Sequence, residues 1–257
     1  MLNGLHLNGP SFLASVMTAG EAEIALDHGA DIIDAKDPTR GALGALPQPS
    51  IRAIVAAVHG RAPVSATIGD LPSDAAMMVA AAQGIAATGV DFVKAGFFEG
   101  GLFESRAPSG AIAALGAAGL SRARLIGVLM ADLQPDFELI IAMAKAGFAG
   151  VMLDTANKAD GGLLDAMPAR RIAEFIQLAR AHHLMAGLAG SLRAADIAPL
   201  KKFSPDVLGF RGALCSSGGR TGALDAARVR SIATEIKAAG PLSSGLSRST
   251  TIERPAP

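Results

Sequence analysis

The segment AGEAEIALDHGADIIDAKDP (residues 19–38) contains one complete helix–strand unit. Its first part, residues 19–28, is an alanine-rich, helix-like run, and its last part, DIIDAK (residues 31–36), is a short apolar run of strand length. Gly29 stands between them, where the left-handed conformation open to glycine ends a helix. The same glycine position recurs in two later units, at Gly89 and Gly147.

Units of this kind recur along the chain with a period of about 30 residues. The short apolar runs are residues 12–17, 31–36, 64–69, 92–97, 125–130, 150–155, 184–190 and 207–212. The helix-like segments that follow them are residues 19–28, 50–59, 74–88, 108–118, 135–146, 168–182, 193–203 and 224–239. Eight strand–helix units are the number found in a (β/α)8 barrel.

The alternative α/β fold is a doubly wound open sheet, which usually has fewer strands and a glycine-rich fingerprint after its first strand. Here the first strand continues into SVMTAGEAE (residues 15–23), which has no GxGxxG pattern. The sequence therefore predicts one α/β domain, a (β/α)8 TIM barrel, over residues 1–240, with a short N-terminal extension. Residues 241–257 are polar and rich in Ser and Pro, and we expect them to form a flexible tail outside the domain.

The composition excludes several classes of partner. Half of the 257 residues are apolar and 18% are charged, so the chain can bury a sizeable core. The 23 basic and 23 acidic residues balance, which argues against binding to nucleic acid or to an anionic membrane. Aromatic residues make up 4%, without Trp or Tyr, which fits poorly with a base-stacking platform or an aromatic-anchored β-sandwich.

The sequence also bears on the cellular location and the oligomeric state. Cys215 is the only cysteine, so no internal disulfide is possible, as is usual in a reducing cytoplasm. The first ten residues lack Lys and Arg and do not read as a signal peptide, and the most apolar stretch, residues 75–90, is interrupted by glycines. We expect a cytoplasmic protein. The sequence leaves the oligomeric state open, because an Ala- and Met-rich helix such as residues 74–88 can pack between subunits as easily as against the barrel; we expect a homo-oligomer.

Lysine and aspartate residues stand at the predicted C-terminal strand ends, where barrels of this type carry their chemistry. Asp34 and Lys36 are two residues apart on one strand, so both side chains point to the same face. Lys94 is a lone charge in the apolar strand FVKAGF, where burial disfavours the charged form of an amine and so favours nucleophilic or basic action. Asp154 ends its strand, and Lys158 follows in the loop.

For any one of these lysines, a structural salt bridge with a nearby aspartate is the alternative. Lysines at three strand ends, two of them with an Asp close by in sequence, favour catalysis instead. The histidines lie in the N-terminal extension or at helix ends on the opposite face, so none is predicted to be catalytic; they are His6, His28, His59, His182 and His183. No CxxC, HExxH or clustered His/Cys spacing occurs, and no metal site is predicted.

Two glycine-containing loops near the end of the chain indicate phosphate binding. Loops seven and eight of such barrels often bind phosphate through backbone N–H groups and a helix N-terminus. The candidate phosphate-binding residues are Gly190, Ser191, Arg211, Gly212, Gly218, Gly219 and Arg220. A flexible Gly/Ser loop is the alternative interpretation. Cys215 lies in the same loop without a His partner nearby in sequence, so we interpret it as a packing residue rather than a nucleophile.

Six strings in order resemble one enzyme family. They are ADIIDAKDP, VSATIGD, VDFVKAG, GVMLDTANKADG, GLAGSL and LGFRGALC. Together they resemble (5-formylfuran-3-yl)methyl phosphate synthase, also called 4-(hydroxymethyl)-2-furancarboxaldehyde-phosphate synthase, over residues 15–239. The resemblance implies a (β/α)8 carbon–oxygen lyase that condenses two molecules of glyceraldehyde 3-phosphate, with loss of phosphate and water. It also implies a role in methanofuran or methylofuran biosynthesis and no metal or organic cofactor.

The resemblance assigns roles to individual residues. The Lys of DAKDP, Lys36, matches the Schiff-base residue of the family, and the Lys of DFVKAG, Lys94, matches its proton acceptor. Asp34, Asp154 and Lys158 match further active-site positions. This sequence departs from the archaeal pattern of the family in its N-terminal extension, its SSGGRTG loop and its C-terminal tail, so the phosphate contacts are the least certain to carry over.

Two alternative functions remain open at this point. A class I aldolase or a triose-phosphate isomerase-like enzyme would use the same lysines and would differ only in its product. A phosphate-ligand binding barrel without turnover would be stabilised by triose phosphate but would form no imine. The triose phosphate itself is a small-molecule partner in every case.

Overall fold

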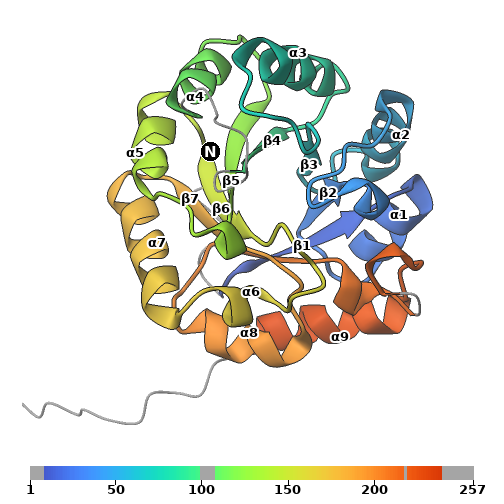
Figure 1. Cartoon of the computed structure of the whole chain (residues 1–257). Coiled ribbons are helices and arrows are strands. Elements are labelled where there is room, and N and C mark those ends of the chain that lie inside the picture. The colour runs from blue at the N-terminus through green and yellow to red at the C-terminus, as the bar shows by residue number, and fades with distance from the viewer. Residues whose placement is uncertain (1–8, 99–107, 217–218, 239–257) are drawn as a thin grey trace, which may run out of the picture.

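Eight parallel strands close into a barrel in the order β1 to β8, and β1 pairs with β8 to complete it. Figure 1 shows this ring of strands in the computed structural model, with the helices arranged around its outside. The structure describes residues 9–98, 108–216 and 219–238. The predicted (β/α)8 TIM barrel is confirmed.

Each of the eight predicted strands is present. They are β1 (Ser11–Val16), β2 (Ile32–Ala35), β3 (Val64–Thr67), β4 (Phe92–Phe97), β5 (Arg124–Met130), β6 (Gly150–Asp154), β7 (Met185–Leu188) and β8 (Val207–Phe210). The register of the first three strands places Ser15 beside Asp34 and Asp34 beside Ser65. This pairing aligns three polar side chains across neighbouring strands, and it determines the base of the site described below.

A helix follows every strand. The helices are α1 (Ala19–Asp27), α2 (Gln48–Val58), α3 (Ala75–Ala86), α4 (Pro108–Gly116), α5 (Glu138–Lys145), α6 (Leu163–Ala166), α7 (Ala169–Ala181), α8 (Ala194–Lys201) and α9 (Ala226–Lys237). Short 3-10 helices occupy the loops at η1 (Pro38–Arg40), η2 (Ala131–Leu133), η3 (Gly212–Leu214) and η4 (Gly219–Thr221). The glycines expected to end helices, Gly29, Gly89 and Gly147, all have positive φ angles. The four-residue helix α6 and the 3-10 turns were not predicted.

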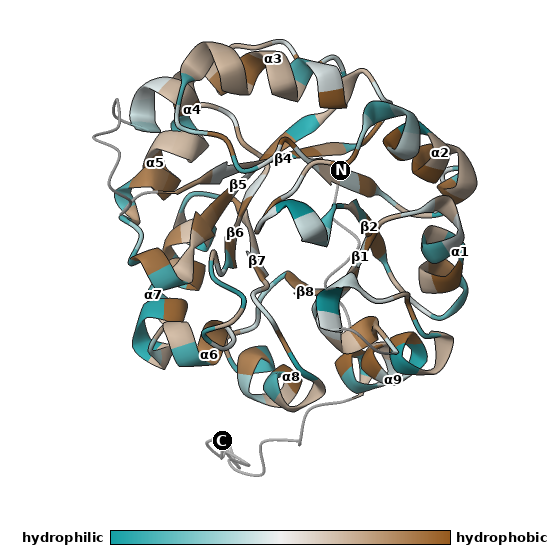
Figure 2. Cartoon of the chain, turned by 45° about the vertical axis from the view of Figure 1, so that its right-hand side comes forward, coloured by the Kyte–Doolittle hydropathy of each residue, from teal (hydrophilic) through white to brown (hydrophobic). Residues whose placement is uncertain are grey.

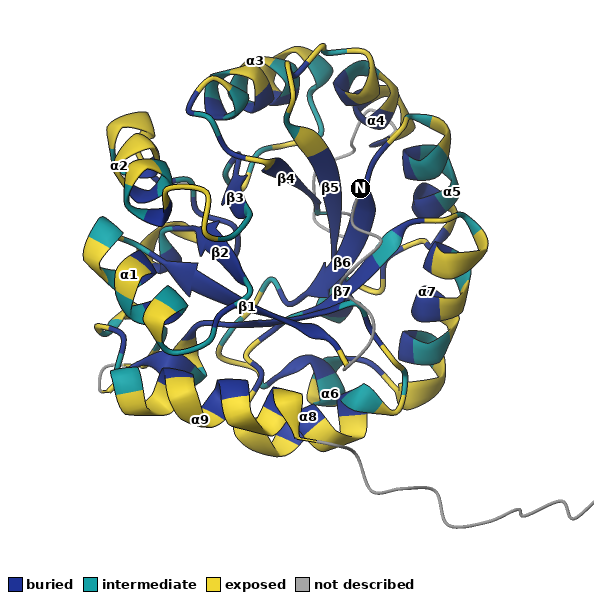
Figure 3. Ribbon diagram, turned by 180° about the vertical axis from the view of Figure 1, so that it is seen from behind, coloured by how far each residue is buried: buried dark blue, intermediate teal, exposed yellow. Residues whose placement is uncertain are grey.

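The apolar core has two layers. The larger layer lies between the sheet and the helices, and the smaller one fills the barrel interior with residues such as Leu13, Phe92 and Met152. Helix α7 shows why the outer layer forms, since its buried residues Ile172, Phe175, Ile176 and Ala179 follow the three- and four-residue spacing of one helix face. Figure 2 shows hydrophobic and hydrophilic bands side by side on α7 and α9. Figure 3 shows buried strands surrounded by helices with exposed outer faces.

Some sequence-based expectations lie outside the described residues. These are the N-terminal extension at residues 1–8, Gly218 in the last loop and the tail at residues 241–257. In the described ranges, no helix has both the length and the apolar character needed to cross a membrane.

Candidate active site

A cavity of about 330 Å³ at the C-terminal ends of the strands brings four of the predicted catalytic residues together. Lys36, Lys94, Asp154 and Lys158 all line it. They come from three elements, because Lys36 directly follows β2, Lys94 lies within β4, and Asp154 ends β6 with Lys158 in the loop beyond. Residues far apart in sequence therefore meet where a barrel of this type carries its chemistry.

Asp34 forms the base of the site and is fully buried. Its carboxylate accepts hydrogen bonds from the hydroxyls of Ser15 at 3.0 Å and Ser65 at 2.7 Å, and from the Lys94 ammonium at 3.1 Å to each oxygen. Burial alone would raise the pKa of Asp34, but the nearby ammonium groups of Lys94 and Lys36 outweigh it and hold the pKa below its ordinary value. Asp34 is therefore a buried carboxylate ion that fixes the position of Lys94.

Asp154 is shared by two lysines. Its carboxylate forms a close ion pair with Lys158, four residues later in the chain, and lies 3.6 Å from the amine of Lys36. It also accepts a hydrogen bond from the backbone N–H of Thr155 at 2.8 Å. Burial would raise the pKa of Asp154, but Lys158 and Lys36 lower it further than burial raises it. Lys158 is the more tightly held of the two lysines, since it also donates to the Thr155 hydroxyl at 3.2 Å.

Lys36 is the least restrained amine of the three. Its distance of 3.6 Å to Asp154 exceeds a normal hydrogen bond, whereas Lys94 and Lys158 each donate to a carboxylate within hydrogen-bond distance. Burial lowers the pKa of Lys36 to about 8; Asp154 opposes this shift, and Lys94 adds to it. Among the described residues, the cavity thus combines three lysines with two carboxylates, and Lys36, which has no close partner, has a lowered pKa.

Several of the predicted phosphate-binding residues line the same cavity. Gly190, Ser191, Gly212 and Arg220 line it, and the helix α8 begins three residues after Ser191. The guanidinium of Arg220 donates to the carbonyl of Gly41 at 2.7 Å, so its side chain bridges the loops after β8 and β2. Gly219 begins η4 without lining the cavity.

Arg211 requires a correction to the sequence-based expectation. It borders the cavity, but all five of its N–H groups bond within the protein. They bond to the Glu21 carboxylate through both terminal nitrogens, and to the carbonyls of Ser15, Arg220 and Gly222. A phosphate could reach this guanidinium only by breaking those bonds. The interpretation of Arg211 as a direct phosphate ligand is therefore not supported.

The histidines that cap helices and the cysteine lie where the sequence predicted them, whereas His6 is outside the described residues. His28, His59 and His182 are the C-terminal caps of helices, on the side away from the cavity. Cys215 is buried, its thiol contacts the Arg211 carbonyl at 3.3 Å, and burial raises its pKa. In the described ranges, no group of three or more His, Cys, Asp or Glu side chains is arranged to hold a metal ion.

Comparison with known proteins decides the family. The sequence profile of the family described as 4-HFC-P synthase matches residues 12–233. The chain belongs to the (5-formylfuran-3-yl)methyl phosphate synthase family. A relative from Methylorubrum extorquens is 47% identical over 232 residues, which cover 90% of this chain and 93% of the relative. The (5-formylfuran-3-yl)methyl phosphate synthase of Methanopyrus kandleri is 36% identical over 239 residues, covering 88% of this chain and 99% of that protein.

Solved structures of other enzymes share the fold of this synthase family member. Phosphoribosyl anthranilate isomerase from Thermus thermophilus matches with a TM-score of 0.60 at 14% identity, over 88% of this chain and 97% of the other. 3-Hexulose-6-phosphate synthase from Salmonella typhimurium matches with a TM-score of 0.59 at 16% identity, over 88% and 98% of the two chains. At such identities the likeness extends to the barrel alone.

Reasoning from the sequence missed the residues that hold the synthase-family lysines and loops in place. Ser15 and Ser65 are small polar residues within apolar strands, and this is the sequence signal that could have identified them. The structure adds their register beside Asp34. Asp70 accepts from the backbone N–H groups of Ala42 and Leu43, in the loop after β2. Asp132 likewise accepts from the N–H groups of Ala156 and Asn157, just before Lys158. A sequence does not reveal such contacts between loops.

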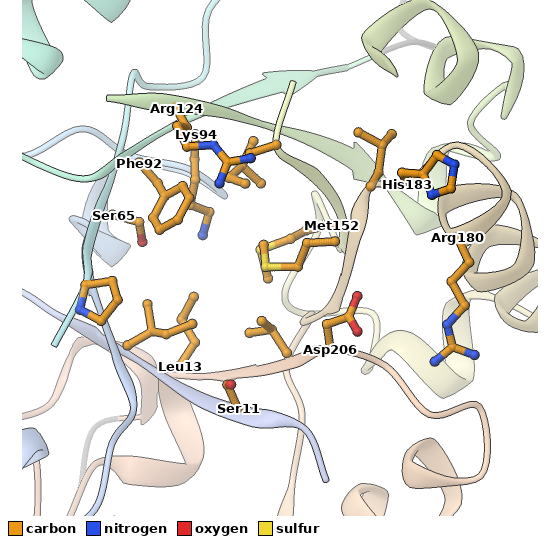
Figure 4. Close-up of a pocket in the computed structure, with 17 residues that line it drawn as sticks. Ser11, Leu13, Ser65, Phe92, Lys94, Arg124, Met152, Arg180, His183 and Asp206 are labelled. Carbon is orange, nitrogen blue, oxygen red and sulfur yellow. The ribbon is translucent and has the colours of Figure 1, made fainter. Parts of the chain in front are cut away.

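A second cavity of about 730 Å³ opens at the opposite mouth of the barrel. Figure 4 shows Ser11, Phe92 and Arg124, the first residues of β1, β4 and β5, around it. Although this cavity is the larger, only Lys94 of the five catalytic candidates reaches it. The smaller cavity is the candidate active site, because the lysine–aspartate cluster lies there.

Proposed function

We propose that this protein condenses two molecules of glyceraldehyde 3-phosphate into (5-formylfuran-3-yl)methyl phosphate through a Schiff base on Lys36. The observation that carries this proposal is the buried amine of Lys36, which has a pKa of about 8 and no hydrogen-bonded carboxylate. An uncharged amine is the form that attacks a carbonyl. The family membership supports the same reaction, and the product would serve methanofuran or methylofuran biosynthesis.

The first step joins Lys36 to a triose phosphate. The amine of Lys36 adds to the carbonyl carbon, and water leaves to give an imine. Protonated, this imine withdraws electrons from the neighbouring C–H bond, which can then lose a proton to a nearby base. We assign Lys94 as that base: it lines the same cavity, Asp34 fixes its position through two contacts of 3.1 Å, and it must first give up its own ammonium proton to become the free amine that accepts the substrate proton.

The second step forms the carbon–carbon bond. The resulting enamine attacks the aldehyde of a second triose phosphate, and Asp154 and Lys158 lie beside Lys36 to move protons in the later eliminations. One phosphate and two molecules of water leave overall, and the imine is hydrolysed to free Lys36. Formation of the aromatic furan ring makes these eliminations favourable.

The substrate phosphate groups need positively charged or N–H-rich surroundings. We assign one phosphate to the side of the cavity formed by Gly190, Ser191, Gly212 and Arg220. Backbone N–H groups near the start of α8 and the Arg220 guanidinium are suitable donors for such a dianion.

Product analysis tests the proposed function directly. Purified protein is incubated with glyceraldehyde 3-phosphate, and the products are separated and identified by mass spectrometry. We expect a furan aldehyde phosphate with near-ultraviolet absorbance, together with free phosphate. A six-carbon bisphosphate, an isomerised triose phosphate or unchanged substrate would instead identify an aldolase, an isomerase or a binding protein.

A further inference from the structure

A buried ion pair borders the same cavity. The guanidinium of Arg211, at the end of β8, meets the carboxylate of Glu21, in the first turn of α1, at 2.6 Å and 3.2 Å. Their side chains are 6% and 12% exposed. A two-contact Arg–carboxylate pair in such surroundings is geometrically specific, because both planar groups must face each other.

Arg211 holds the part of the loop after β8 from Arg220 to Gly222 in place. Besides the contacts to Glu21, it donates to the carbonyl of Arg220 at 2.8 Å, to that of Gly222 at 2.8 Å and to that of Ser15 at 3.1 Å. The first two contacts fix both ends of the stretch from Arg220 to Gly222. The third connects this stretch to β1.

Glu21 connects two further segments. Its carboxylate accepts hydrogen bonds from the backbone N–H groups of Met17 at 2.8 Å and Leu224 at 3.3 Å. Thr18 caps the same helix by accepting from the N–H of Glu21 at 3.2 Å, so Glu21 also takes part in capping α1. Helix capping alone would explain the contact to Met17, but it does not require a buried arginine from the opposite end of the chain.

The contacts of Arg211 and Glu21 fix the position of Arg220. Its carbonyl is held by Arg211, and its side chain lines the cavity and reaches the Gly41 carbonyl across the mouth. Burial lowers the pKa of the Arg220 guanidinium, while the carboxylates of Asp154 and Asp70 favour its charged form. Arg220 is thus a charged group between the lysine cluster and the loop after β2.

We propose that Glu21 and Arg211 are positioning residues that hold Arg220 in place to bind a phosphate ester at the cavity mouth. This inference rests on the proposed function in assigning that ester to a triose phosphate. Arg211 itself does not contact the substrate. Its effect on the reaction is on substrate binding, while the chemistry on Lys36 and Lys94 proceeds unchanged once the substrate is bound.

The variant Arg211→Lys distinguishes the positioning of Arg220 from simple neutralisation of the Glu21 charge. Lysine keeps the positive charge beside Glu21, but its single nitrogen cannot serve Glu21 and the carbonyls of Ser15, Arg220 and Gly222 together. We expect KM for glyceraldehyde 3-phosphate and the inhibition constant for inorganic phosphate to rise together by about tenfold, with kcat within about twofold. Glu21→Gln is expected to raise both constants as well. In the double variant neither constant should exceed that of the single variant with the larger effect, because both residues act through one network.

Two controls distinguish positioning from loss of stability. Arg61→Lys makes the same exchange in the exposed pair with Asp27 and is expected to leave KM unchanged. Phe175→Leu, in the core under α7, is expected to lower the melting temperature without changing KM. If Arg211→Lys alters only the melting temperature, or lowers kcat without raising KM, or if its effect adds fully to that of Glu21→Gln, the positioning role is wrong.

The inorganic phosphate measurement keeps this proposal separate from the proposed function. Phosphate binding, followed by calorimetry, does not depend on which product the protein makes. If wild-type protein binds phosphate and Arg211→Lys weakens it, the positioning role stands even where no furan product forms. If the wild-type protein forms the furan but Arg211→Lys binds phosphate as tightly as wild type, the positioning role fails and the proposed function stands.

Discussion

At the scale of single residues, the site depends on how two carboxylates are distributed among three lysines. Asp34 forms an ion pair with Lys94, and Asp154 lies closer to the amine of Lys158 than to that of Lys36. A buried ammonium without a close counterion loses stability relative to its neutral form. In the proposed reaction its surroundings therefore favour nucleophilic attack by Lys36, and none of the described residues that line the cavity is a histidine.

The pH dependence of imine formation follows from this arrangement. Trapping of a triose phosphate on Lys36 should rise as pH increases through about 8 and then level, because the free amine is the reacting form. Asp154→Asn removes the anion that raises the pKa of Lys36, so the midpoint should move to lower pH by about one unit. The measurement is the rate of cyanoborohydride trapping against pH.

The control for this experiment is Asp160→Asn, which makes the same change in charge at an exposed loop position. Its midpoint should match that of the wild-type protein. A midpoint that stays fixed in Asp154→Asn, or that moves equally in Asp160→Asn, would show that Asp154 does not set the ionisation of Lys36.

At the scale of elements, carboxylates in one loop hold the backbone of another. Asp70, after β3, binds the loop after β2, and Asp132, after β5, binds the loop after β6. Each uses both carboxylate oxygens on two successive N–H groups. Loops held in this way keep the lysines in place before substrate arrives, and such preorganisation lowers the cost of reaching a productive geometry.

Replacement of Gly41 tests the contact between Asp70 and the loop after β2. A Cβ at this position would lie 1.9 Å from an oxygen of Asp70, and the φ of +105° disfavours any other residue. Gly41→Ala should therefore displace Asp70 and destabilise the fold by about 2–4 kcal/mol in urea unfolding. Gly60→Ala is the matched control, since Gly60 also has a positive φ, +72°, but no atom within 4 Å of the added Cβ. Equal losses of unfolding free energy in the two variants would mean that the Asp70 contact contributes nothing to stability.

The elements themselves were largely predictable from the sequence, and their contacts were not. Short, mainly apolar runs such as FVKAGF locate β4, because a strand buried on both faces is a nearly continuous apolar run. Helix α6 was missed because its four residues are too few to show a helical period. The inward direction of Asp34 and Lys36 followed from strand alternation, but the partner of Arg211 lies 190 residues away, where local patterns carry no information.

At the scale of the whole molecule, the apolar core and the ionised groups occupy different parts of the barrel. The apolar layer between strands and helices carries the fold, while ionised groups gather at one mouth of the barrel. The buried pairs of that cluster tie stability to pH, since Asp34 and Asp154 have lowered pKa values. The native protein keeps both ionised at pH values where the unfolded chain has already bound protons.

Acid should therefore destabilise the protein through these two residues. Their contribution is fully present above the ordinary value of 3.8, and it is lost progressively as pH falls below it, because the unfolded state then binds more protons. For Asp154 the expected loss is on the order of 2 kcal/mol or more, measured by urea unfolding at neutral and acid pH, and Asp34 is expected to act in the same direction. Asp154→Asn should show a smaller loss between the same two pH values than Asp160→Asn, and equal losses would contradict the assignment.

The most direct test of the account is the site of covalent capture. Protein incubated with glyceraldehyde 3-phosphate and borohydride, then digested and analysed by mass spectrometry, should carry the reduced triose phosphate on Lys36. The Lys36→Arg variant should carry none. A label on Lys94 or Lys158 in the wild-type protein, or continued labelling of Lys36→Arg, would show that Lys36 is not the residue that forms the imine.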